Sequence, residues 1–162
     1  MVCLTLISRI KACRPNLQFH PIIDLLKNWA DIFENDSQTK AFNKLEQAVR
    51  TVHPEETDEI LPLVATLMGM ELKGRYAERI EGIEDEALEK LIVKNVRELV
   101  IKGSDLRPTI TIMEDLHCAD TSSIELLEVL YRLAENTSFR NFVDIIFIVG
   151  HKNSSDRLSQ WG

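Results

Sequence analysis

The chain has 162 residues, of which 44% are hydrophobic and 28% charged, and its formal net charge is -7. This composition is typical of one folded domain and excludes a largely disordered chain. The acidic balance argues against a broad basic surface, so no nucleic-acid partner is expected. No apolar run is long enough to span a bilayer, so no membrane partner is expected either. The three cysteines form no CxxC pair, which fits a reducing cytoplasm.

The first half of the chain is predicted to be one strand followed by helices. Residues 2–10 form an apolar run typical of a buried parallel strand, and 14–21 are predicted to be a loop. Apolar residues at helical spacing predict helices from Ile22 to Phe33, from Phe42 to Val52 and over 57–70. Residues 71–83 are expected to be irregular because they contain two glycines.

The second half alternates between helices and strands. Residues 84–102 carry the strongest helical pattern, and "GSDLRP" is expected to end that helix. Thr109–Met113 and 143–149 are predicted strands, and Ser122 with Glu125 fits a capping box that starts a helix between them. The order predicts an α/β fold, with a parallel sheet of about three strands and flanking helices.

Two carboxylates follow the middle strand directly, at Glu114 and Asp115. The carboxyl ends of parallel strands meet at the edge where open α/β sheets bind ligands. Mg²⁺ prefers oxygen ligands and keeps several waters, so one or two carboxylates suffice when phosphates supply the other ligands. In this interpretation Glu114 holds the metal and Asp115 orients an attacking water. The alternative is that both side chains simply solvate the end of a strand.

The segment "RPTITIMEDLHCADTSSIELLEVLYRLAE" resembles the Walker B region of the STAND branch of P-loop ATPases. These are AAA-like modules fused to class III adenylate cyclases, Ser/Thr kinases and MalT-like or tetratricopeptide regulators. The shared run comprises Glu114, Asp115, Leu116, His117, Ala119 and Asp120, while Cys118 replaces the usual tryptophan. The resemblance extends over nearly the whole chain, but its specific part is 108–134.

The resemblance implies a partial three-layer P-loop NTPase fold of the ASCE type, with Mg²⁺ and ATP as cofactors of the complete module. It implies that Glu114 is a metal ligand and Asp115 the catalytic, water-orienting residue. Asp120 either caps the following helix or supports the metal site. Lys152 stands where the family often carries an arginine, and it either faces the phosphates of the nucleotide or belongs to a solvated loop. The complete module would bind ATP, hydrolyse it slowly and switch an attached effector.

A phosphate-binding GxxxxGK[ST] loop is not present in these 162 residues, whose six glycines are all at least five positions apart. Residues 1–162 are therefore interpreted as a single truncated ATPase-like domain, completed by the remainder of a larger protein or by a partner chain. The chain alone is expected to show no ATP turnover and no tight ATP binding, so its status as an enzyme depends on that completion. The strand at 143–149 is expected at an edge of the sheet that is either open or covered by a partner chain.

Two other functions stay open. One is a non-catalytic protein-interaction domain that keeps the ATPase-like fold. The other is a metal-dependent hydrolase that uses Glu114, Asp115 and Asp120 without a phosphate loop.

Overall fold

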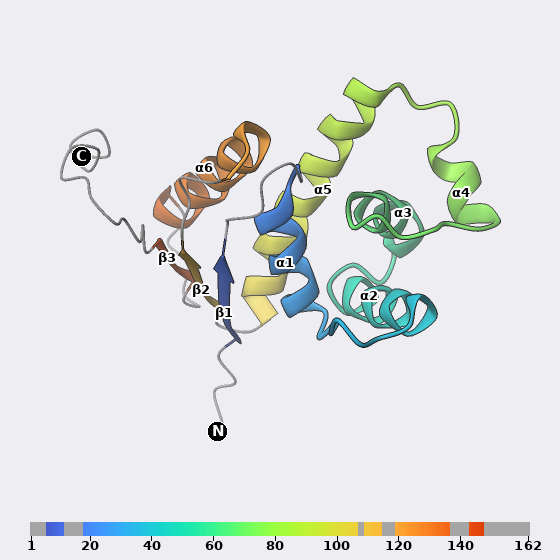
Figure 1. Cartoon of the computed structure of the whole chain (residues 1–162). Helices are drawn as coiled ribbons and strands as arrows, with labels where there is room; N and C mark the ends of the chain where they lie inside the picture. The colour runs from blue at the N-terminus through green and yellow to red at the C-terminus, as the bar shows by residue number, and fades with distance from the viewer. Residues whose placement is uncertain (1–5, 12–17, 107–108, 115–118, 137–142, 148–162) are drawn as a thin grey trace.

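The computed structural model describes residues 6–11, 18–106, 109–114, 119–136 and 143–147 (Figure 1). Within these ranges the chain forms β1 (Leu6–Lys11), α1 (His20–Trp29), α2 (Gln38–Val52), α3 (Thr57–Leu67), α4 (Arg75–Ile80), α5 (Asp85–Leu106), β2 (Thr109–Glu114), α6 (Thr121–Asn136) and β3 (Val143–Phe147). A strand is thus present within or across each of the predicted ranges near 2–10, 109–113 and 143–149, of which residues 2–5 and 148–149 lie outside the described residues, and every predicted helix has a counterpart.

The three strands pair in parallel in the order β1–β2–β3. The register places Lys11 beside Glu114, so the last residues of β1 and β2 lie together at the carboxyl edge. In the part of the sheet that the structure describes, β3 forms one edge, as expected.

The helices lie in successive tiers beside this sheet (Figure 1). α1 packs on β1, and α1 and α5 lie between the sheet and the pair α2–α3. α6 contacts β3, α5 and α1, while α4 lies farthest from the strands, against α3. The buried residues whose side chains are described all belong to helices or to the turns beside them.

The fold class predicted from the sequence needs correction. A partial three-layer P-loop NTPase fold would be organised around its sheet, whereas the described chain is predominantly helical. The physical reason is that α2 and α3 bury their apolar faces on each other and on α5, not on the strands. The short parallel sheet is a side feature of a mainly helical structure.

Two local predictions were also wrong. α5 does not end before Gly103 but continues to Leu106. A Cβ atom at Gly103 would lie 3.3 Å from Trp29 Nε1, so this glycine leaves room for the Trp29 indole against α5. The segment 71–83, which was expected to be irregular, contains the short helix α4.

The turn between α1 and α2 is fastened by the carboxylate of Asp36, whose side chain is only 1% exposed. Its oxygens lie 2.7 Å from Lys40 Nζ and 2.6 Å from Lys44 Nζ, and it accepts a hydrogen bond from the Phe33 N–H. These donors, Lys40 first, hold the pKa of Asp36 far below its usual value. The next residue, Ser37, caps α2 by accepting a hydrogen bond from the Lys40 N–H.

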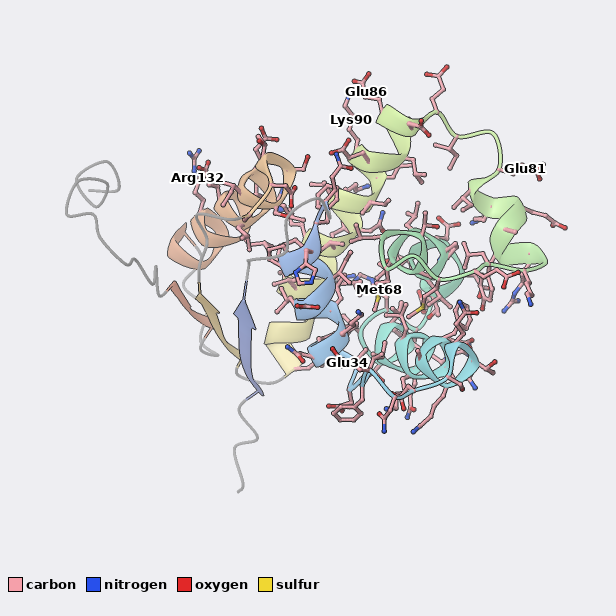
Figure 2. All side chains as sticks on the ribbon, viewed as in Figure 1. Glu34, Met68, Glu81, Glu86, Lys90 and Arg132 are labelled. Atoms are coloured by element: carbon pink, nitrogen blue, oxygen red, sulfur yellow. The ribbon has the colours of Figure 1, made fainter. Side chains whose placement is uncertain are left out.

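Because its folded-state pKa is depressed, Asp36 stabilises the fold at every pH above its unfolded-state pKa of about 4. That contribution is lost as the pH falls below this value. We expect Asp36→Asn to lower the midpoint of urea unfolding at pH 7, and the difference from the wild type to shrink at pH 3. The exposed residue Glu34 (Figure 2) provides the control, since Glu34→Gln should change little at either pH. An equal Asp36→Asn effect at both pH values would contradict the ionic origin of the stabilisation.

Candidate functional site

The candidate site lies at the carboxyl edge of β1 and β2. Glu114 is the last residue of β2, and the parallel register places its backbone beside that of Lys11. This is the edge where open parallel sheets bind ligands. Asp115 and Lys152, and with them His117 and Cys118, lie outside the described residues.

Asp120 links the segment that follows β2 to the turn that precedes α1. Its Oδ2 accepts a hydrogen bond from the Phe19 N–H at 3.0 Å, across 101 positions of sequence. Its Oδ1 accepts the Ser123 N–H at 2.9 Å, and the Ser123 hydroxyl donates to Oδ2 at 2.5 Å. We call this set of contacts the Asp120 junction. It ties the segment after β2 to the turn between β1 and α1.

The backbone of Phe19 adopts an unusual conformation at this junction. Its φ of 58° and ψ of 16° are left-handed, a region that costs energy for any residue other than glycine. The side chain is 7% exposed, and the residue precedes α1 without a side-chain cap. Burial of the ring and the hydrogen bond to Asp120 both offset the cost of this conformation, so the turn depends on the junction.

The junction decides one question that the sequence left open. Asp120 is the cap of α6, because it accepts the N–H of the third helical residue and its own carbonyl accepts the Ile124 N–H. The predicted capping box of Ser122 with Glu125 was therefore wrong, since α6 begins at Thr121. An aspartate three positions before a serine was the signal for the correct cap. Participation of Asp120 in a metal site stays a prediction.

His20 is a polar residue at this edge that the sequence did not single out. It begins α1, directly after Phe19, and is 7% exposed. Its Nε2 lies 3.6 Å from Asp24 Oδ2, whereas its Nδ1 is buried and has no hydrogen-bond partner among the described residues. Buried polar atoms are normally paired, so an unpaired one next to the candidate site is notable.

Within the described ranges, no group of three or more His, Cys, Asp or Glu side chains is arranged to hold a metal ion. This finding does not extend to Asp115 or His117, which lie outside those ranges. It does not extend to the side chain of Glu114 either, since only the backbone of this residue is described.

No protein-family model, curated protein or solved structure matches this chain. The candidate site therefore rests on its own residues and geometry. None of the helices in the described ranges is long and apolar enough to cross a membrane.

The Asp120 junction can be tested through stability. Asp120→Ala removes the cap of α6, at a cost of about 0.5–2 kcal/mol, and leaves the Phe19 N–H unpaired, at a further cost of about 1–3 kcal/mol. We expect a total loss of about 2–4 kcal/mol in the free energy of urea unfolding. Thr121→Ala, at the exposed neighbouring position, should cost much less. Equal effects of the two substitutions would show that the junction contributes little.

Proposed function

We propose that the carboxyl edge of β1 and β2 is the magnesium-binding half of a nucleotide site in an ATP-dependent signalling protein. The phosphate-binding half would be supplied by polypeptide outside these 162 residues. The observation that supports this most is the parallel register, which puts Glu114 at the end of the central strand β2. The proposal depends on this edge and on the sequence of 108–134, and does not require the three-layer fold expected from the resemblance.

In this proposal Glu114 holds Mg²⁺, directly or through a water, and Asp115 orients the water that attacks the terminal phosphate. Carboxylates alone would repel the phosphates, so ATP would bind tightly only where a phosphate loop supplies backbone N–H groups and a lysine. Mg²⁺ would then link the two halves, because its remaining ligands are phosphate oxygens and waters. Lys152 would be a further contact to the nucleotide.

The Asp120 junction supports a switching role for the same edge. Asp120 lies six positions after Glu114 and bonds to the turn that starts α1. α1 in turn packs on β1 and lies between the sheet and the pair α2–α3 (Figure 1). A change in the segment after β2 on nucleotide binding would therefore reach α1 through a single hydrogen bond. As part of this proposal we place the protein in the cytoplasm, joined to the remainder of a larger protein or to a partner chain.

The second candidate is a non-catalytic interaction domain. It is favoured by the mainly helical body, in which the α2–α3 pair lies on the far side of α1 and α5 from the strands. A domain of this kind would have no need for a metal at Glu114. Metal binding at the carboxyl edge therefore distinguishes the two functions.

The first test uses Mn²⁺ as a paramagnetic substitute for Mg²⁺ in NMR spectra of the chain. We expect weak binding, with a dissociation constant of roughly 10⁻⁴–10⁻³ M, because few anionic ligands are present. The amide signals of Lys11, Glu114 and Ser123 should broaden before those of α2 and α3. A Glu114→Gln, Asp115→Asn double variant should lose this preference, whereas Glu86→Gln, at the far end of α5 (Figure 2), should keep it. Uniform broadening over all acidic surfaces would favour the interaction domain.

The second test needs the polypeptide or complex that carries the phosphate loop. In that assembly Asp115→Asn should preserve Mg-ATP binding but slow hydrolysis by roughly 10²–10⁴-fold, the usual contribution of a positioned base. Glu114→Gln should instead weaken the Mg²⁺-dependent part of ATP binding. Calorimetry and steady-state phosphate release measure the two effects separately. If both substitutions left binding and turnover unchanged, the carboxylates would only solvate the end of β2.

A further inference from the structure

The segment 74–82, which contains α4, is attached to the molecule differently from the other helices. α4 is six residues long and none of its residues is buried. Gly74 and Gly82 flank it with φ values of 56° and 77°, and nothing lies within 4 Å of the positions that their Cβ atoms would occupy. Glycine is therefore required there by the backbone conformation and not by lack of space. The segment therefore has a conformationally permissive glycine at each end.

Charged side chains fasten α4 to α2 and α3. Arg79 pairs with Glu59, and Arg75 Nη2 lies 3.2 Å from Asp58 Oδ1. The Tyr76 hydroxyl lies 3.3 Å from Asp58 Oδ1 and 3.5 Å from Glu46 Oε1. The four side chains of the two ion pairs are each more than half exposed. Pairs of this kind are individually weak and are screened by salt.

Among the backbone hydrogen bonds that join this segment to its flanking turns, none reaches α2 or α3. Ala77 and Glu78 donate to the Gly74 carbonyl, Glu81 donates to Ala77, and Ile83 donates to Ile80. The bonds to the Gly74 carbonyl and to Ala77 stay within 74–82 and would move with the segment, whereas the Ile83 bond to Ile80 crosses Gly82 and would break when the segment turns there.

The apolar contact beneath α4 is incomplete. The Tyr76 and Phe42 rings lie 5.7 Å apart at 54°, and Tyr76 and Ile80, four positions apart on α4, are only partly buried. On the body side Phe42, which faces Tyr76, is also only partly buried. α3 differs in that seven of its residues are buried, Leu61 and Val64 completely. Detaching α4 would therefore leave the core of α2 and α3 intact.

We propose that residues 74–82 form an ionic strap, which detaches from α2 and α3 as a unit while the rest of the fold stays closed. The strap turns on Gly74 and Gly82, and its release exposes the Phe42 ring together with the acidic side chains of Glu46, Asp58 and Glu59. In the closed state α4 itself covers this surface, with Arg75 and Arg79 beside Tyr76 and Ile80. Figure 2 shows Glu81, at the end of α4, on the side of the molecule away from the sheet. The strap is independent of the nucleotide site proposed above.

The test is hydrogen exchange on the full 162-residue chain, resolved to single amides by NMR. Arg79→Glu reverses one ion pair, and the double variant Arg79→Glu, Glu59→Arg restores it with opposite polarity. We expect the amides of α4 to exchange about tenfold faster in Arg79→Glu, while those of α2 and α3 change less than about twofold. The double variant should return close to the wild-type rates. In the wild type, 0.5 M NaCl should speed exchange in α4, because it shortens the Debye length to roughly a few ångströms and so screens these ion pairs.

Arg97→Glu is the matched control, because it makes the same charge change at an exposed position of α5. It should leave the exchange rates of α4 unchanged. The proposal is wrong if the amides of α4 exchange no faster than those of α3 in the wild type, since α4 would then open only with global unfolding. It is equally wrong if α4 is unprotected in the wild type, or if the double variant fails to restore protection.

Discussion

Burial of the apolar stripe of α5 is the interaction on which the rest of the described structure depends. Ile92, Val96 and Leu99 recur at intervals of four and three residues, which places them on one face of the helix, and all three are buried. Through this face and its neighbours α5 contacts α2, α3 and α6. The helices on the far side and the helix beside β3 are thereby brought into one body. Without α5, the α2–α3 pair would have little to attach it to the strands.

Much of the local structure could be predicted because it depends on local patterns. Strand positions followed from short apolar runs, and the end of α2 followed from His53 before Pro54. The length of α5 could not be predicted in this way, because Gly103 is tolerated through its contact with Trp29, far away in sequence. The fold class was mistaken for a related reason. Apolar runs indicate that a strand exists, but not whether the longer helices pack on the sheet or on one another.

The candidate site was predictable in part. A carboxylate at the end of a parallel strand follows from sequence order, and the register of β1 and β2 puts Glu114 at that edge. The bond from Asp120 to Phe19 was not predictable, because it joins residues whose proximity depends on the tertiary fold. The buried Nδ1 of His20 was missed because a histidine beside a proline reads as a loop residue until its exposure is known.

The contact between Gly103 and Trp29 also limits how this chain can change over evolutionary time. A larger residue at 103 would need either a shift of the Trp29 indole or a smaller residue at 29, because an added Cβ would lie 3.3 Å from Nε1. The two positions lie on different helices and have no reason from local propensity to vary together. They should nevertheless change as a pair among related sequences, because each defines the space available to the other.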